Sequence, residues 1–449
     1  MNTATRRSQW DHPGNLPAAT HSVSSTSADR GALSPQCARI SSERRQPAGL
    51  ILTYSTLAIK GNNNGIEDNG DEVFDMTPWL LNTRLKFETY LDSLRKEHAV
   101  PACAVGVVAA DGPPELFVRG SRRSDCQVPV TKADKFTLSI NETMTCVILA
   151  MLVDRGLITW DERLVDHIPA SVSRRVHPFH KETTFSMVAS SNSGISDSWW
   201  QAGNGDLLRY LSRSEISAKQ GRFAVALYYL VRPPDHTPGT KAVWHQANGV
   251  LIALALEEIT NQPFESLLKA LLFDPLEMYS TGFGWPDITR NIVTSPRQPW
   301  GHAGTSKEPR GDFSGQGLNM NACYPFQGIH CSAADYAIYI KFELRCSMGL
   351  DTKGLLSQQG MKEMFERISD EEHSCNRAGW IIASRDWAKG LTFSNAGHQL
   401  GASNGAWIAP LTGKAFFSIS NIDGTVGFKA NDEAIYAAVR YARDSKSER

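Results

Sequence analysis

The chain has 449 residues, a length typical of about three domains or of one large domain. Glycine (35 residues) and proline (22 residues) occur near their average frequencies and 41% of the residues are hydrophobic, which excludes collagen-like and wholly low-complexity proteins and supplies a large core. The 46 Lys and Arg residues nearly balance the 47 Asp and Glu residues, so the net charge of −1 argues against a protein that binds a nucleic-acid backbone, and we expect a small molecule or another protein as the partner.

Residues 1–72 are predicted to form a disordered tail and linker. Residues 1–48 are rich in Ser, Thr, Ala, Arg and Pro without hydrophobic periodicity, residues 50–54 have the composition of a short strand, and residues 61–71 are polar and glycine-rich. The N-terminus has no apolar segment of the signal-peptide kind, and no run approaches 18 consecutive apolar residues. We therefore expect a cytoplasmic protein with no membrane partner.

The eight cysteines are scattered, with no Cys-x-x-Cys pair and no Cys/His cluster at the spacing of zinc ligands. We expect reduced thiols, most of them buried, because disulfides need an oxidising compartment. The sequence indicates no cofactor and no metal.

The folded body is expected to span residues 73–449. Apolar residues recur at helical spacing over residues 79–98 and predict a helix. An apolar run at residues 100–108 and the segment Glu115–Val118 flank a turn at Asp111–Pro113, so we predict a strand, a turn and a second strand.

A long, loop-rich helical stretch follows, and strands return only near the C-terminus. The strand-like segments and the helix that closes the chain are Gly379–Ala383, Gly405–Ala409, Ala415–Ser420 and Asp432–Arg443. Because both ends of the body carry strands and helices, we predict one α+β unit. Its sheet part spans about 73–138 and 375–449, and its helical part about 139–374.

The segment Phe136–Asp161 resembles the first active-site segment of the serine β-lactamase and penicillin-binding-protein family. The resemblance is closest to the class C branch with its fungal esterase and acyltransferase relatives. In that family, Ser-x-x-Lys opens an apolar helix that ends in Leu-Val-x-x-Gly. Ser139 falls at the position of the nucleophile, 17 residues before Gly156, and the spacing to Trp160 fits as well.

Four further segments resemble family segments and follow in the family's order. They are Thr184–Gly194, Pro238–Asn248, Leu272–Thr281 and Asn395–Gly401. The resemblance implies a β-lactamase/transpeptidase-like fold of the α+β class, with an antiparallel sheet, flanking helices and an inserted all-α subdomain. It also implies a cleft between the two parts, faced by Ser139 at the start of a helix.

The residues that carry the family's chemistry are largely replaced. A serine hydroxyl needs an adjacent base, and the family supplies a lysine one helical turn away together with the tyrosine of Tyr-x-Asn. Here Glu142 stands at the position of the lysine, Trp244 at that of the tyrosine and Gln246 at that of the asparagine. Glu142 reverses a charge, and an indole has an N–H donor but no basic oxygen, so we do not expect the Ser-Lys-Tyr mechanism.

The third motif of the family is altered too. Asn395 replaces a His or Lys, whereas Gly397 is kept. We predict that Gln246, Asn395, Gly397 and His398 bind substrate. His398 either replaces the missing histidine after a shift of its loop or lies on a solvated loop.

Each catalytic candidate also has a structural interpretation. Ser139 and Glu142 have the S-x-x-E spacing of a capping box, whereas a buried Glu142 with a raised pKa would accept the Ser139 proton. Trp244 is either an apolar wall of the cleft or a core residue. His245 is either an acid or base in the cleft or turned away from it, because neighbouring residues of an extended chain point oppositely.

Three functions fit these residues. The first is a small-molecule enzyme of specialised metabolism that performs non-hydrolytic acid–base chemistry (isomerisation, cyclisation or dehydration). In it Glu142 is the acid or base, Ser139 or His245 its partner, and Trp244 the wall. The second is a serine ester hydrolase or acyltransferase that uses Ser139. The third is a catalytically inactive binding protein.

Overall fold

The computed structural model describes residues 83–195, 205–286, 296–310, 320–369, 374–399 and 401–444. All of them belong to the unit Ile51–Arg449. The tail and linker expected over residues 1–72 and the start of the body at residue 73 lie outside the described residues.

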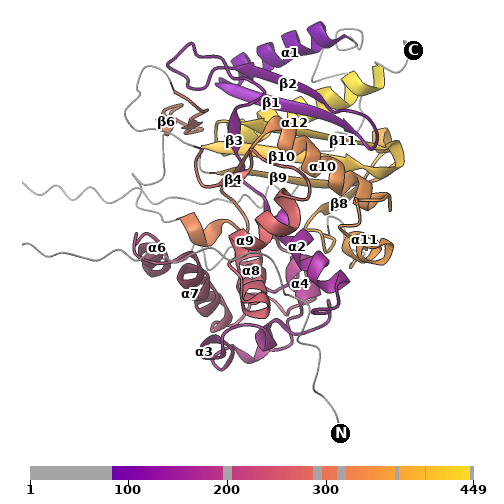
Figure 1. Ribbon diagram of the computed structural model, residues 1–449. Helices are drawn as coiled ribbons and strands as arrows, with labels where there is room; N and C mark the ends of the chain where they lie inside the picture. The colour runs from indigo at the N-terminus through magenta and orange to yellow at the C-terminus, as the bar shows by residue number, and fades with distance from the viewer. Residues whose placement is uncertain are drawn as a thin grey trace, which may run out of the picture. The chain divides into compact units, whose positions relative to one another are not determined.

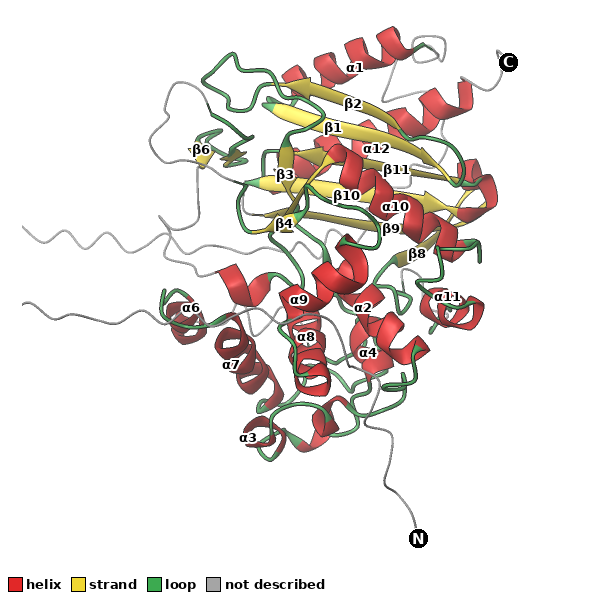
Figure 2. Ribbon diagram, in the orientation of Figure 1, coloured by secondary structure: helices red, strands yellow, loops and turns green. Residues whose placement is uncertain are grey.

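A six-stranded antiparallel sheet organises the fold (Figures 1 and 2). Its strands are β1 (Ala102–Ala109), β2 (Glu115–Gly120), β8 (Ile381–Arg385), β9 (Gly390–Gln399), β10 (Ala402–Ala409) and β11 (Lys414–Ser420). They lie in the order β2-β1-β11-β10-β9-β8, and each neighbouring pair is antiparallel. Because β1 pairs with β11, with Val105 opposite Ser418, strands from the two ends of the described chain lie side by side within the sheet.

Helices cover both faces of this sheet. They are α1 (Arg84–Glu97), α10 (Ala333–Ser347) and α12 (Gly424–Asp444). Successive side chains of a strand point to opposite faces of the sheet, so the buried residues of each strand are divided between two cores. In β1, Cys103 and Val105 belong to the core with α1 and α12, whereas Ala104 and Val108 belong to the core that contains α10.

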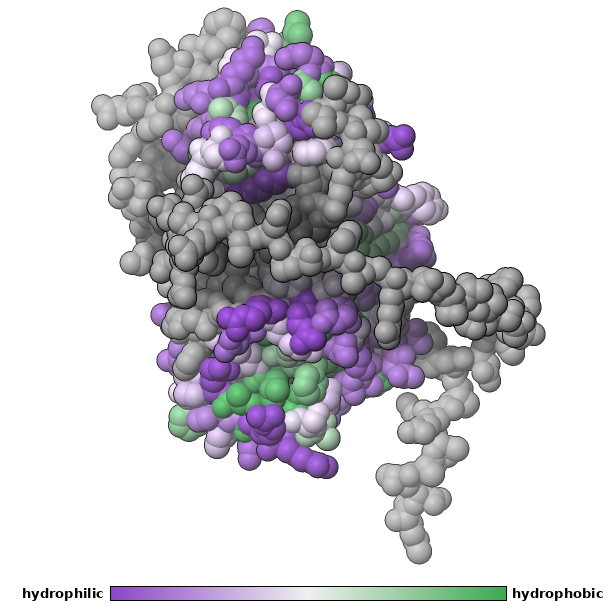
Figure 3. Space-filling model, turned by 90° about the vertical axis from the view of Figure 1, so that its left-hand side faces the viewer, coloured by the Kyte–Doolittle hydropathy of each residue, from purple (hydrophilic) through white to green (hydrophobic). Residues whose placement is uncertain are grey.

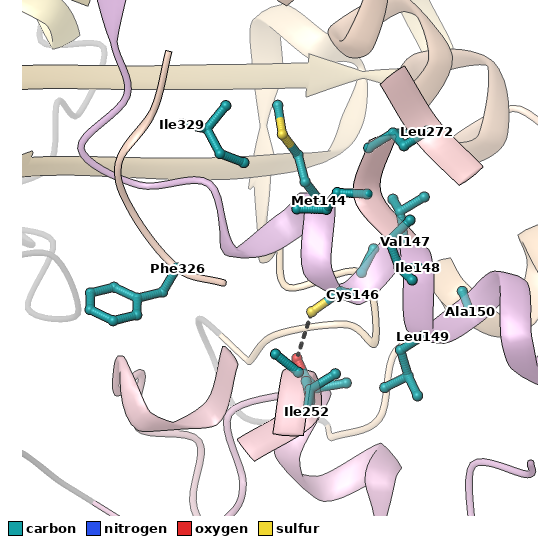
Figure 4. Packing of buried hydrophobic residues seen from close by; sticks show 14 of the residues in the cluster. Met144, Cys146, Val147, Ile148, Leu149, Ala150, Ile252, Leu272, Phe326 and Ile329 are labelled. Carbon is teal, nitrogen blue, oxygen red and sulfur yellow. Dashed lines mark hydrogen bonds between the residues drawn. The ribbon is translucent and has the colours of Figure 1, made fainter. Parts of the chain in front are cut away.

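The remaining helices form a second group around α2, α7 and α8. They are α2 (Glu142–Asp154), α3 (Ala170–Ser173), α4 (Phe185–Ala189), α6 (Gly205–Leu211), α7 (Ala218–Leu230), α8 (Ala247–Thr260), α9 (Phe264–Leu268) and α11 (Gln358–Phe365). α2 contacts α8, α9 and α11, and Met144, Val147 and Ile148 of α2 cluster with Ile252 of α8 and Leu272 (Figure 4). A helix that is apolar around its whole circumference is a core helix, so the position of α2 is fixed on all sides.

Short elements complete the described chain. They are β3 (Lys135–Thr137), β4 (Gly282–Phe283), β5 (Gly301–His302), β6 (Pro309–Arg310), β7 (Ile329–Ser332), the 3-10 turns η2 (Leu164–Asp166), η3 (Pro178–His180), η6 (Met320–Cys323), η7 (Asp386–Ala388) and η8 (Pro410–Thr412), and the π-helical turn η4 (Lys269–Phe273).

Most elements predicted from hydrophobic patterns are confirmed. The N-terminal helix and the strand pair after it are α1, β1 and β2, and the three C-terminal segments overlap β8, β10 and β11. The closing helix α12 begins earlier than expected, at Gly424. β9 was not predicted, because its sequence carries few apolar residues and its pairing with β8 and β10 holds it in the sheet.

The stretch predicted as helical, residues 139–374, also contains strands of a small second sheet and a helix that packs on the six-stranded sheet. β7 pairs with β3 and β4, and α10 packs on β1, β10 and β11. Elements that pack on the sheet therefore occur both before and after residue 374. Local periodicity identifies a helix but does not say what the helix packs against.

None of the described helices combines the length and the apolar character needed to cross a membrane. On the face drawn in Figure 3, hydrophilic residues cover most of the coloured surface, and hydrophobic residues gather in a small area in its lower part. The seven described cysteines are free thiols, five of them buried.

Candidate functional site

The segment that leads into α2 holds two of the predicted catalytic residues. The helix begins at Glu142 with Asn141 as its N-cap residue, so Ser139 lies outside the helix. The Ser139 hydroxyl donates a hydrogen bond to Oδ1 of Asn404 on β10 at 3.0 Å. The capping-box prediction is therefore wrong, because a tertiary partner holds Ser139 in place of the N–H groups of the helix.

Asn404 fixes the backbone of this segment as well. Its Oδ1 accepts hydrogen bonds from the N–H groups of Ser139 (2.8 Å) and Ile140 (3.1 Å), and its Nδ2 donates to the Ile140 carbonyl (3.0 Å). Ser139 is only 1% exposed. A neutral amide is not a base, so these bonds position Ser139 without activating it. They also turn the Ser139 N–H toward a protein oxygen, away from any substrate oxyanion.

Gly397 on β9 passes directly beside Ser139. A Cβ placed on Gly397 would lie 2.9 Å from the Cβ of Ile140 and 3.3 Å from the Oγ of Ser139. A side chain at this position would therefore force the strand away from the start of α2, and the absence of one allows the close approach.

Glu142 and Trp244 are brought into direct contact. The indole Nε1 of Trp244 donates a hydrogen bond to Oε2 of Glu142, and the backbone of Gly249 provides a second one. Gly249 lies in the first turn of α8, where the side chain of the N-cap residue Gln246 makes no capping bond. The Glu142 carboxyl thus lies at the N-terminal end of α8, where a helix has unpaired N–H groups and the positive end of its dipole.

Burial dominates the electrostatics of Glu142. The residue is 4% exposed, and desolvation raises the pKa of its carboxyl to about 8 against the lowering effect of the bonds from Trp244 and Gly249. Most of this carboxyl is protonated at neutral pH. It can therefore donate a proton, which a glutamate at its ordinary pKa cannot do under the same conditions.

Two residues close to this site, Glu343 and Asn404, were not predicted from the sequence. Glu343 on α10 is a buried carboxyl whose pKa desolvation raises to about 8, and the Tyr339 hydroxyl joins it to Thr143, next to Glu142. One feature of the sequence could have indicated Glu343. It is an acidic residue one helical turn after Tyr339, with apolar neighbours in the same helix. Asn404 had a similar signal, because it follows a serine in a strand whose other residues are apolar or glycine.

Other predicted residues are held by the protein itself. His245 is fully buried with its ring centroid 4.9 Å from that of Tyr229 on α7, and burial lowers its pKa to about 3. It is neutral at physiological pH and packs in the helical core. Gln246 is buried at the start of α8, and Asn395 donates from Nδ2 to the Gly379 carbonyl at 3.2 Å.

Neither interpretation of His398 holds. The residue lies on β9, not on a solvated loop, and the register with β10 fixes its position. Its ring packs 5.8 Å from that of Phe428 on α12, and burial lowers its pKa. Since neighbouring residues of a strand face opposite sides and Gly397 faces Ser139, His398 points to the other face of the sheet.

Among the described residues, no three His, Cys, Asp or Glu side chains come close enough together to hold a metal ion. The site is therefore built from one carboxyl, one indole, backbone N–H groups and a buried serine. Such a set of groups is suited to proton transfer and to binding of a polar group next to an aromatic surface.

Comparisons with solved structures find the same fold. The octameric penicillin-binding protein homologue from Pyrococcus abyssi matches with a TM-score of 0.60 and 16% identity, over 78% of this chain and 76% of that chain. SurE matches with a TM-score of 0.61 and 18% identity, over 80% and 76%. A D-stereospecific amidohydrolase from Streptomyces sp. matches with a TM-score of 0.57 and 18% identity, over 78% and 97%. At these identities the likeness concerns the fold alone.

The comparison with family models is more direct. No curated protein matches the chain significantly. The model of the β-lactamase family, however, matches residues 87–440 in one stretch that includes the sheet, α2 and α8. With more than half of its length matched, this chain belongs to the β-lactamase family.

Proposed function

We propose that this chain is a small-molecule enzyme that performs non-hydrolytic acid–base chemistry on the β-lactamase fold. Glu142 is the general acid and base, and Trp244 orients its carboxyl. The observation that carries the proposal is the buried Glu142 carboxyl, held by the Trp244 indole at the N-terminal end of α8 and protonated at neutral pH. The reaction is an isomerisation, a cyclisation or a dehydration. The acid protonates a carbonyl or hydroxyl oxygen, and the resulting carboxylate removes a proton from carbon.

The proposed substrate is an apolar metabolite with one oxygen function. The half-buried indole of Trp244 offers apolar surface, and a protonated carboxyl donates to a carbonyl or hydroxyl oxygen. We assign the activity to specialised metabolism, where such ring-forming and dehydrating steps on apolar carbon skeletons are frequent.

Serine acyl chemistry is less well supported. It needs a base beside the serine hydroxyl and N–H groups that can hold an oxyanion. The hydroxyl and the N–H of Ser139 both donate to Asn404, and Glu142 accepts from Trp244.

The test combines ligand screening with turnover by the full chain. Metabolites are screened by thermal shift, since a ligand that binds the native state raises its melting temperature, and each hit is incubated with the protein and followed by mass spectrometry. We expect products without added water. Glu142→Gln should lower kcat by about 100-fold or more while the ligand still binds. Trp244→Phe removes a bond that lowers the pKa of Glu142, so the pH profile should move to higher pH.

Asp432→Asn is the control, since it makes the corresponding change on α12, at a carboxyl whose pKa burial raises to about 6, and should leave turnover intact. A fluorophosphonate probe separates the acyl alternative. An adduct in the wild type that disappears in Ser139→Ala would replace the proposal with serine chemistry. Ligand binding without turnover would make the chain a binding protein.

A further inference from the structure

A pocket lies at the C-terminal end of α2, away from Glu142. It has a volume of about 480 Å³ and is lined by the end of α2, the loop after it, α11 and Arg377. α11 and α2 lie side by side (Figure 1). At about 1.5 Å per residue, the helix separates this pocket from Glu142 by roughly 15–20 Å. The volume falls within the range of small-molecule sites.

Three of the charged side chains that line the pocket, Glu363, Glu366 and Arg377, are held by hydrogen bonds to other protein groups. Glu363 accepts from Trp160 Nε1 at 3.1 Å and from Gln359 Nε2 at 2.6 Å. Arg377 donates to Glu366 Oε2 at 2.7 Å, and its Cζ lies 5.3 Å from the centroid of the Trp160 ring. These bonds hold the three side chains in the walls of the pocket, and the Arg377–Glu366 pair is an ion pair.

Two further charged side chains of opposite sign line the pocket without such bonds to the rest of the described chain. Lys362 on α11 and Asp161 on the loop after α2 both line the pocket and are exposed. Neither makes an ion pair or a side-chain hydrogen bond with any of the described residues. Val153 and Gly156 bring the C-terminal end of α2, the negative end of its dipole, to the same lining.

We propose that this pocket binds a small zwitterion of the amino-acid type, which carries one ammonium group and one carboxylate. Lys362 binds the carboxylate, and Asp161, together with the C-terminal end of α2, binds the ammonium group. The buried side chains of Ile158 and Trp160 form an apolar floor for the carbon chain between the two charges. A simple cation or a simple anion would leave one of the two protein charges unpaired. The pocket shares no side chain with the Glu142 site, so the two proposals fail separately.

The test uses a ladder of linear ω-amino acids, from glycine to 6-aminohexanoate, titrated into the full chain by isothermal calorimetry. We expect affinity to depend on chain length, because one ligand has to reach both Lys362 and Asp161 across the pocket. The alkylamine and the alkanoate of the length that binds best should bind about tenfold or more weakly, because each lacks one charge-assisted contact.

Variants locate the ligand. Lys362→Gln and Asp161→Asn should each lower the affinity about tenfold or more, whereas Lys132→Gln, which removes an exposed lysine outside the pocket, should leave it unchanged. Equal binding by the single-charge compounds would overturn the proposal. So would the lack of any binding at millimolar concentration, or affinity that survives both pocket substitutions.

Discussion

Glu142 loses nearly all of its solvent on folding, and this changes its affinity for a proton. In the unfolded chain a glutamate has a pKa of about 4.3. In the folded protein burial raises the pKa of Glu142 to about 8. Between these two values the folded protein binds a proton that the unfolded chain releases. The contribution of Glu142 to the free energy of unfolding therefore falls as the pH rises from about 5 to about 8.

We predict that Glu142→Gln flattens this pH dependence, because an amide has no proton to lose. Urea unfolding at about pH 5.5, 7 and 8.5 should show that the free energy of unfolding of the wild type, relative to that of the variant, falls as the pH rises. The comparison with the variant cancels the contributions of the buried histidines, whose lowered pKa values act in the opposite direction. Glu343→Gln should have a similar effect, since burial raises the pKa of Glu343 to about 8 as well. If Glu142→Gln kept the full pH dependence of the wild-type free energy of unfolding, the Glu142 carboxyl would be ionised in the folded protein.

The sequence identifies most of the residues of the candidate site, and the structure shows which of them are in contact. Motif spacing singled out Ser139, Glu142 and Trp244, and the structure brings Trp244 and Glu142 into contact across 102 residues of chain. The partner of Ser139 was not predictable. Asn404 lies 265 residues away, and nothing local to either residue indicates that β10 passes beside the start of α2.

At the scale of elements, a single side chain on β10 ties the sheet to the start of α2. We predict that Asn404→Ala lowers the free energy of unfolding by about 3 kcal/mol or more, because it leaves the buried N–H groups of Ser139 and Ile140 and a carbonyl without partners. Ser139→Ala removes one hydroxyl bond and should cost about 1 kcal/mol. Urea unfolding measures both variants. Equal losses would show that Asn404 does not hold the backbone.

The starts of two helices show when a local capping pattern predicts the structure and when it does not. Ser332 caps α10, and its side chain accepts a hydrogen bond from the Asp335 N–H. The S-x-x-E pattern at Ser139 was an equally good local signal, yet Asn404 competes for the same hydroxyl. A capping pattern is reliable only where no tertiary partner competes for its side chain.

At the scale of the whole molecule, the two ends of the described chain share one core. The ring of Phe87 on α1 stacks on that of Tyr441 on α12 at 4.8 Å and meets Phe117 of β2 edge-on at 4.7 Å. The sheet on which both helices pack is also built from both ends, because β1 and β11 are neighbours. Loss of this core should therefore destabilise the molecule as a whole and not one end alone.

We predict that Phe87→Ala lowers the free energy of unfolding by about 3–5 kcal/mol, since the ring is fully buried. Leu85→Ala is the matched control on the same helix, because Leu85 is 74% exposed and its loss should change stability by about 0.5 kcal/mol or less. Circular dichroism during urea unfolding measures both. Similar effects of the two variants would mean that α1 is not part of the shared core.

The sequence by itself determined the family, the α+β class and most of the elements, because motif spacing and hydrophobic period are local properties of the chain. It also determined that the lysine and the tyrosine of the family's mechanism are replaced, at Glu142 and Trp244. Only the tertiary structure decided what these replacements do. Burial sets the proton affinity of Glu142, a distant strand takes the hydroxyl of Ser139, and the sheet register turns His398 to the far face. Each of these depends on which segments meet in space, and that information is not carried by any one segment.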